Sequence, residues 1–202
     1  MCLLLGMTAA LHAEEIKPDS TSAVPLYTQE ELVGLINKNQ HLQRVKADDC
    51  QLLDDIKARA EVMALPSYQF LYGDMLAYGV CLDANVELGV HYMRQAAQQG
   101  LAAALEQLGR YYDTGKLVQR DKAMAITYLR EAAAQGNLAA QLRFVRLLND
   151  GHGSPRDFES AYHWLFHAVV ADAKVHKQIE TALAQLAEKM PESVVKRARL
   201  SN

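Results

Sequence analysis

The sequence has little that points to a membrane span, a nucleic-acid partner or a catalytic site. Its 202 residues carry a net charge of −3, so no basic excess favours binding to nucleic acid. The only long apolar run is residues 1–13, which is too short to cross a bilayer as a helix. Half of the residues are apolar, 22% are charged and only five are proline, as is typical of one ordinary globular domain.

A pattern of 36 residues is repeated along the middle of the chain. Between residues 68 and 136 the same glycine, tyrosine and alanine positions occur twice at this fixed offset, and a weaker third copy follows. Such a period indicates a solenoid, in which each unit buries its apolar face against its neighbours. In the third copy, Val145 and Asp172 replace two of the glycines, so the third unit is expected to end differently. The matching sets are Gly73/Gly109, Gly79/Gly115/Gly151, Tyr92/Tyr128/Trp164, Ala96/Ala132/Ala168, Ala97/Ala133 and Gly100/Gly136.

Each unit has the pattern of a helix, a turn and a second helix. In the second copy, apolar residues at helical spacing lead to Gly115, where the chain can turn in a left-handed conformation. Asp121 then precedes a second helical run, and its equivalents in the other copies are Asn85 and Asp157. A short polar side chain at this position can accept a hydrogen bond from an amide at the start of the second helix. We therefore predict an all-α fold, an α-solenoid of helix-turn-helix repeats.

The segments outside the repeats have distinct characters. The uncharged start of the chain resembles a secretory signal with cleavage before Glu14, although it lacks the usual initial lysine or arginine, so we expect the true start upstream. Asp49 stands where a helix cap would fall in a degenerate first unit. The predicted organisation is a signal peptide (1–13), an extended linker (14–26), N-terminal helices with a degenerate half repeat (27–64), three repeats (65–172), and a C-terminal capping helix with a basic tail (173–202).

Two cysteines remain once the predicted signal, with Cys2, is removed. In the repeat register, Cys50 lies near the predicted cap of the degenerate unit and Cys81 lies in the turn of the first full repeat. Both places are on the same edge of adjacent hairpins, and an even count in an exported protein favours a disulfide. The alternative is a pair of free buried thiols.

Candidate chemistry is sparse. His163 and His167 have the four-residue spacing of a two-histidine metal site, but mixed polar residues occupy the equivalent positions in the other copies, which favours a solvated helix face. No nucleophile pairs with a base, and no glycine loop for phosphate is present. We therefore expect no enzymatic activity, no cofactor, no metal and no small-molecule substrate. His41 has no partner that the sequence identifies.

The first helices of the repeats suggest a surface for a protein partner. Residues beside their packed faces fall in parallel rows, which on solenoids commonly hold an extended peptide or a partner domain. The arginines in these rows would suit an acidic partner, and the alternative is a plain hydrated surface. The candidate groove residues are Leu71, Asp74, Tyr78, Gln107, Arg110, Arg143 and Arg146.

The repeat unit, with its tyrosine, its turn glycine and its closing Ala-Ala-x-x-Gly, resembles the Sel1 repeat, a relative of the tetratricopeptide repeat. Within that family, four strings resemble the MotX family of sodium-type polar flagellar motor proteins, over residues 24–190. The resemblance implies a right-handed α-solenoid of Sel1/TPR-like helix-turn-helix repeats. The strings are HLQRVKADDC (41–50), FLYGDMLAYGVC (70–81), AAQQGLAAALEQLGRYY (96–112) and YLREAA (128–133).

The resemblance also implies a location and partners. Family members are periplasmic proteins of the flagellar basal body, where a ring shared with a MotY-like protein helps to hold stator units through a PomB-like subunit. A competing interpretation is a generic periplasmic Sel1-repeat regulator or envelope-signalling adaptor. A cell-wall or β-lactam hydrolase is the least favoured reading, because no catalytic pair supports it.

Overall fold

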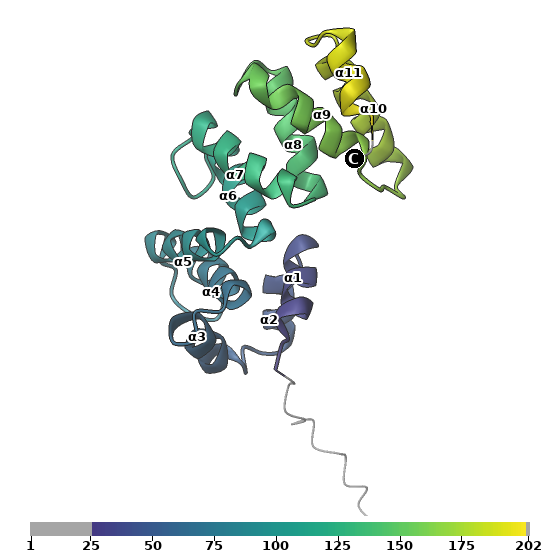
Figure 1. Cartoon of the computed structure of the whole chain (residues 1–202). Coiled ribbons are helices and arrows are strands. Elements are labelled where there is room, and N and C mark those ends of the chain that lie inside the picture. Colours follow the sequence, from purple (N-terminus) through teal and green to yellow (C-terminus); the bar gives the residue numbers. More distant parts are fainter. Residues whose placement is uncertain (1–25, 201–202) are drawn as a thin grey trace, which may run out of the picture.

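The computed structural model describes residues 26–200, in which all regular structure is helical (Figure 1). The predicted signal peptide, nearly all of the predicted linker and the last two residues lie outside the described residues. No helix within 26–200 is both long and apolar enough to cross a bilayer. The elements are α1 (Gln29–Asn37), α2 (His41–Ala47), α3 (Leu53–Glu61), α4 (Pro66–Tyr78), α5 (Val86–Gln98), α6 (Ala102–Thr114), α7 (Lys122–Ala134), α8 (Leu138–Asn149), η1 (Pro155–Asp157), α9 (Phe158–Phe166), α10 (Ala173–Ala187) and α11 (Glu192–Ala198).

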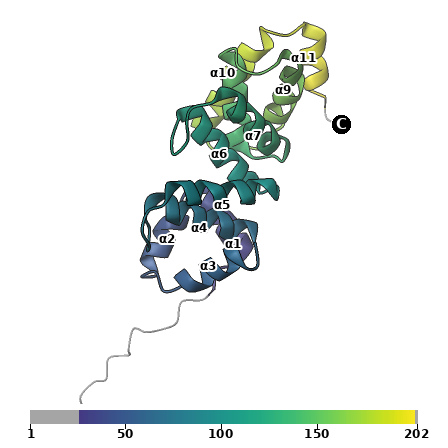
Figure 2. The same ribbon diagram turned by 90° about the vertical axis from the view of Figure 1, so that its left-hand side faces the viewer.

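The helices form a stack of hairpins, which confirms the predicted α-solenoid. The pairs α4–α5, α6–α7 and α8–α9 follow one another along the molecule, and each pair packs on the next (Figures 1 and 2). At the far end, α10 packs on α8 and α9, and α11 packs on α9. The buried face of α10 consists of residues at steps of three and four, as predicted for a helix that closes an exposed end. These residues are Ile179, Ala182, Leu183 and Leu186.

The turn and cap residues of the first two repeats act as predicted. Gly79 and Gly115 end α4 and α6 with φ angles of +62° and +76°, in the left-handed region that glycine adopts without a steric cost. The Asn85 side chain accepts a hydrogen bond from the Leu88 amide at 3.0 Å. Asp121 accepts from two amides at the start of α7, at 2.9 and 3.0 Å. Local chemistry therefore fixes where these helices begin and end.

Two predicted caps are wrong. Asp49 does not cap a helix: it lies at φ +50° in a turn, and α3 begins only at Leu53 without a side-chain cap. Asp157 also caps nothing, because the short helix η1 precedes α9 and carries the chain into it. The Asp157 carboxylate instead accepts two hydrogen bonds from Arg130, at 2.9 and 2.7 Å. A contact with α7 thus replaces the local cap.

The third repeat ends early. Helix α9 stops at Phe166, so Ala168, the predicted equivalent of Ala132, lies beyond the helix. Asp172, where the earlier copy has a glycine, accepts a hydrogen bond from the Val175 amide at 2.8 Å and begins α10. The loss of glycine at this position therefore coincides with the start of the closing helix.

The cap at Asp121 allows a quantitative test. The Asp121→Ala variant is expected to lower the free energy of unfolding by about 1 kcal/mol, because two amides at the start of α7 lose their acceptor. Asp83→Ala is the matched control, since Asp83 is exposed and accepts no hydrogen bond within residues 26–200. Urea unfolding measures both variants. Equal midpoints for the two would contradict a stabilising cap.

The N-terminal helices fold back onto the first repeat. Helices α1 and α2 both pack on α4, and α1 also reaches α6 (Figure 2). Since α3 and α5 pack on other sides of α4, eleven of its thirteen residues are buried. The inner face of the first repeat is therefore occupied by the chain itself.

Candidate functional site

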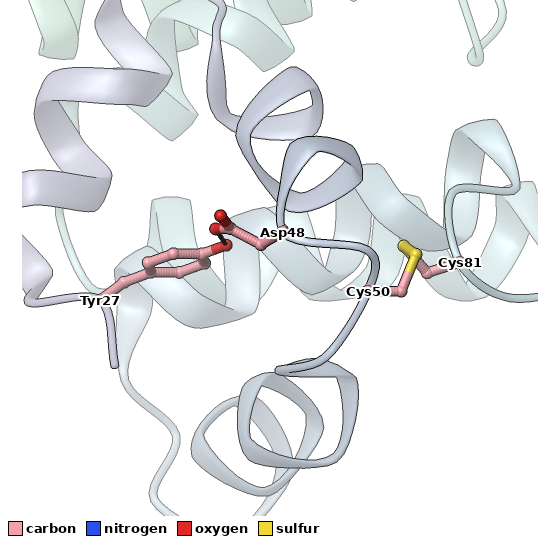
Figure 3. Close-up of a disulfide and its surroundings, with 4 residues drawn as sticks. All are labelled: Tyr27, Asp48, Cys50 and Cys81. Carbon is pink, nitrogen blue, oxygen red and sulfur yellow. Dashed lines mark hydrogen bonds between the residues drawn. A yellow bond between two sulfur atoms is a disulfide. The ribbon is translucent and has the colours of Figure 1, made fainter. Parts of the chain in front are cut away.

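A disulfide joins the N-terminal helices to the first repeat. Cys50 lies in the turn before α3, Cys81 follows the end of α4, and their Cα atoms are 5.7 Å apart (Figure 3). The structure thus contains the predicted bond rather than two free thiols. Both cysteines have positive φ angles, of +60° and +66°, so the bond connects two tight turns. It ties the segment before the repeats to the edge of the stack.

A second attachment lies at the start of the described chain. The Tyr27 hydroxyl donates a hydrogen bond to Asp48 Oδ2 at 2.5 Å (Figure 3). Arg44 Nε donates to the same oxygen at 2.7 Å. The Tyr68 hydroxyl of α4 donates to the backbone oxygen of Tyr27. Burial and the neighbouring Asp48 carboxylate raise the pKa of Tyr27, so this phenol keeps its proton at neutral pH. Helices α1 and α2 are therefore held at both ends.

The predicted groove is only partly a surface. Leu71 is fully buried in the core, and Asp74 and Gln107 are also buried, with exposed fractions of 1% and 8%. These three residues do not form the exposed row that was expected, because α1 and α2 cover α4 and α1 also packs on α6. The remaining four are Tyr78, Arg110, Arg143 and Arg146, which are exposed or half-buried.

The covered part of the row contains a buried polar network that the repeat pattern did not reveal. His41 Nε2 lies 2.6 Å from Asp74 Oδ2, and both side chains are 2% exposed. The Tyr111 hydroxyl donates to Asp74 Oδ1 at 3.3 Å and receives a hydrogen bond from Gln107 Nε2 at 2.7 Å. The Tyr78 hydroxyl lies 2.9 Å from that of Tyr111. Burial, with the nearby Asp74 charge, raises the pKa of Tyr111.

A signal for this network was present in the sequence. Asp74, Arg110 and Arg146 occupy the same position in successive repeats, so the charge at this position changes sign after the first copy. A carboxylate in the copy nearest the N-terminal helices suggests a partner from those helices. Identifying His41 as that partner requires the structure, because the two residues are 33 positions apart and His41 precedes the repeats.

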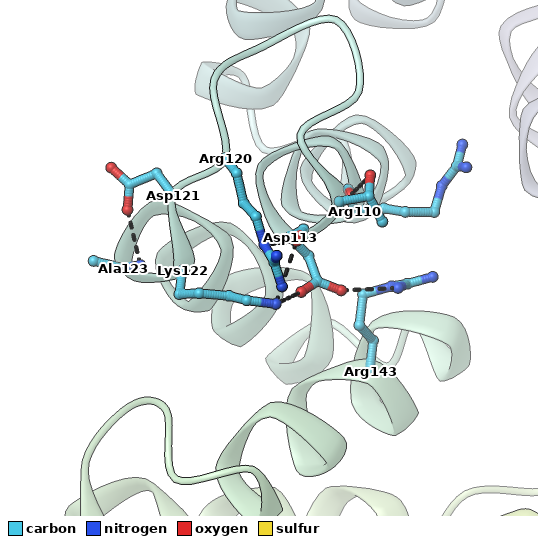
Figure 4. A network of polar contacts seen from close by, with 8 residues as sticks. Arg110, Asp113, Arg120, Asp121, Lys122, Ala123 and Arg143 are labelled. Carbon is cyan, nitrogen blue, oxygen red and sulfur yellow. Dashed lines mark hydrogen bonds and ion pairs between the residues drawn. The ribbon is translucent and has the colours of Figure 1, made fainter.

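The arginines of the row differ in how far their charges are matched. Arg143 forms an ion pair with Asp113 at 3.1 Å (Figure 4). Its Nε also lies 3.8 Å from Glu106 Oε1. Asp113 also pairs with Lys122. Burial pushes the Asp113 pKa up, but Lys122 and Arg143 outweigh it and hold the pKa below its usual range. Arg143 is therefore a structural residue between repeats two and three.

Arg110 and Arg146 form no ion pair within residues 26–200. Arg146 donates to the Gln178 side chain at 2.9 Å, beside a hollow of about 400 Å³ between α8 and α10. Lys174 and Lys177 line the same hollow and also lack ion-pair partners in the described part of the chain. This surface is the more cationic end of the predicted groove.

The two histidines of the predicted pair have different surroundings. The His163 and His167 ring centroids are 4.6 Å apart, but His163 Nδ1 lies 3.0 Å from the backbone oxygen of Ala198. His163 is half-buried against α11, so only His167 matches the expected solvated face. Over residues 26–200, no group of three or more possible metal ligands gathers at one place.

These features define a helical-repeat protein with a closed first repeat and a cationic surface farther along. The comparison with known families agrees with this class, because residues 66–101, 102–137 and 138–166 each match the Sel1 repeat. A solved Sel1 repeat protein from Oxalobacter formigenes has a TM-score of 0.57 and 28% identity, covering 64% of this chain and 97% of its own. A protective antigen of uropathogenic Escherichia coli that displays an SLR fold shares the fold, with a TM-score of 0.53, 23% identity, and coverage of 84% of this chain and 35% of its own.

A relative with a similar length gives a narrower assignment. The sodium-type polar flagellar protein MotX of Vibrio parahaemolyticus is 54% identical over 196 residues, which is 97% of this chain and 93% of that protein. The chain belongs to the Sel1 repeat family and, within it, to the family of the sodium-type polar flagellar protein MotX.

Proposed function

We propose that the chain is a periplasmic, non-enzymatic adaptor of the sodium-driven polar flagellar motor. It acts in a basal-body ring that helps to recruit and hold stator units for torque generation. The observation that carries this proposal is the 54% identity to a sodium-type polar flagellar protein over nearly the full length of both chains. Identity at this level along the whole chain favours a shared role over the fold likeness of distant repeat proteins.

The structure supports an adaptor in an oxidising compartment. The Cys50–Cys81 disulfide is typical of exported proteins, because cytosolic thiols are kept reduced. A stack of hairpins whose N-terminal helices are cross-linked to the first repeat by a disulfide offers a rigid surface for partners. The partners we propose are a MotY-like ring protein and a PomB-like stator subunit. The adaptor raises the local concentration of stator units around the rotor and moves no ions itself.

The surface proposed for an acidic partner is the cationic hollow between α8 and α10. Arg146, Lys174 and Lys177 line it, and none of their charges is matched within residues 26–200. Guanidinium and ammonium groups bind carboxylates through charge-assisted hydrogen bonds. Arg146 is central, because it reaches from the repeats to α10 through Gln178.

The test is deletion of the gene followed by complementation. The deletion is expected to leave flagella assembled but paralysed, and the wild-type chain is expected to restore swimming. Arg146→Glu should restore swimming poorly while the purified variant keeps its helical content, because a carboxylate now faces an acidic partner. Arg156→Glu, at an exposed arginine on η1, is the matched control and should complement fully.

Two outcomes would contradict the proposal. Normal swimming in the deletion strain would exclude a role in torque generation. A pull-down from envelope fractions should recover ring and stator components, and recovery of other signalling proteins alone would favour a generic Sel1-repeat regulator.

A further inference from the structure

We propose that a hollow between α2, α4 and α6 is a binding pocket for a carboxylate side chain of a partner polypeptide. The inference rests on the proposed adaptor role and adds a specific anchor point to it. The hollow has a volume of about 270 Å³ and is separate from the cationic surface between α8 and α10. Its polar lining includes Asn39, His41, Gln107, Arg110, Tyr111 and Lys116.

Two cations line the hollow, which Asp74 also lines, and Arg110 lies near the Glu106 carboxylate. The Arg110 guanidinium lies 5.2 Å from the centre of the Tyr111 ring, and the Lys116 ammonium lies 4.9 Å from the centre of the Tyr78 ring. Neither forms an ion pair in the described part of the chain. The two tyrosine rings therefore position both charges at the rim. An anion entering the hollow would meet two cationic donors that form no ion pair within residues 26–200.

The polar groups at the floor of the hollow are buried and already hydrogen-bonded to one another. Gln107 and Tyr111 are 8% and 0% exposed and hydrogen-bonded to each other at 2.7 Å. The one carboxylate at the floor, Asp74, is already held by His41 at 2.6 Å and by Tyr111. Because these polar groups are fixed before any ligand arrives, binding requires little reorganisation. The internal carboxylate does not reach Arg110 or Lys116 as an ion pair.

An unpartnered atom in the same place also points to a ligand. His41 is 2% exposed, and its Nδ1 is buried without a hydrogen-bond partner in the structure. Buried polar atoms normally have a partner, so such an atom beside a hollow indicates a missing one. Arg110 and Lys116, which line the same hollow, suit a carboxylate better than a cation or an apolar group.

The test is an NMR titration of the full exported chain with three small probes. The probes are an acetylated and methylamidated glutamate residue, the same compound with glutamine, and free glutarate. The glutamate compound should give saturable shifts at the Gln107 side-chain amide and at backbone amides near Tyr111, and the glutamine compound should give none. Glutarate should bind no more tightly than the glutamate compound, because the pocket accepts one carboxylate on a chain.

Variants assign the shifts to the pocket. The double variant Arg110→Gln/Lys116→Gln should bind the glutamate compound about tenfold or more weakly, since two charge-assisted contacts are lost. Arg156→Gln/Lys57→Gln removes one arginine and one lysine at exposed sites elsewhere and should bind normally. Lys116→Gln alone, at an exposed side chain, should weaken binding even if the double variant folds poorly.

Three results would overturn the inference. They are absent shifts with the glutamate compound, equal shifts with the glutamine compound, and binding that the Arg110 and Lys116 variants leave unchanged. Binding of glutarate alone would exclude a polypeptide as the source of the carboxylate. Because these probes contain no motor component, such a failure leaves the swimming test of the adaptor role unaffected.

Discussion

Removing the Cys50–Cys81 disulfide is expected to lower the free energy of unfolding by about 3 to 4 kcal/mol. The two cysteines are 31 positions apart, and closing a loop of that length restricts the unfolded chain by this amount on the chain-entropy relation. The loss is large compared with the stability of a typical domain, which is about 5 to 15 kcal/mol. Urea unfolding of Cys50→Ser and Cys81→Ser under oxidising conditions measures it.

The controls follow from the nature of the bond. Both single variants should lose the same stability, the double variant should lose no more than either, and reductant should bring the native chain to the same level. Unequal losses for Cys50→Ser and Cys81→Ser, or losses that persist in full when all samples are reduced, would indicate that the cysteines stabilise the fold separately. Limited proteolysis should cut the Cys50→Ser and Cys81→Ser variants first between α2 and α3, because the disulfide no longer holds this turn to the first repeat.

Replacing Gly89 with alanine is expected to destabilise the first hairpin by about 1 to 3 kcal/mol or more, as overpacking does in a close-packed core. A Cβ atom at Gly89 would lie 2.5 Å from the backbone oxygen of Gly73 and 2.8 Å from the backbone nitrogen of Ala77. Neither is the movable end of a side chain, so α4 and α5 must separate. Gly73→Ala meets the same obstacle, because its Cβ would lie 2.6 Å from the Gly89 oxygen.

The control for this prediction is Gly34→Ala on α1. A Cβ there meets nothing within 4 Å, and alanine favours helix over glycine, so the variant should be neutral or more stable by about 0.5 to 1 kcal/mol. Thermal unfolding of the three variants gives the comparison. If Gly89→Ala and Gly34→Ala had equal midpoints, the close approach of α4 and α5 in the structure would be wrong.

The parts of the fold that the sequence predicts are those set by local chemistry and repetition. Gly79, Gly115, Asn85 and Asp121 act within a few residues of themselves, and the copies confirm one another. The wrong assignments concern places where the repeat decays, as at Asp157, whose carboxylate contacts Arg130, 27 positions earlier in the chain. Periodicity describes an average unit and cannot show such individual contacts.

The candidate site was harder to predict for a related reason. A prediction from the repeats gives each copy the same surroundings, but α1 and α2 cover the first repeat and α1 also packs on α6. Leu71 and Asp74 are therefore buried, while Arg146, at the position equivalent to Asp74 two repeats later, is exposed. The His41–Asp74 pair depends on how the N-terminal helices fold back, which no spacing within the repeats encodes.

Helices α1 and α2 cover α4, so the two ends of the stack differ. A ligand that threads along a solenoid usually runs past every unit, but here α1 blocks the passage beside α4 and α6. Such a ligand would have to stop or leave sideways at that barrier, with the other end free to extend toward α10. The row of first-helix residues is therefore covered at α4 and exposed at Arg146, so its two ends offer different surroundings to a partner.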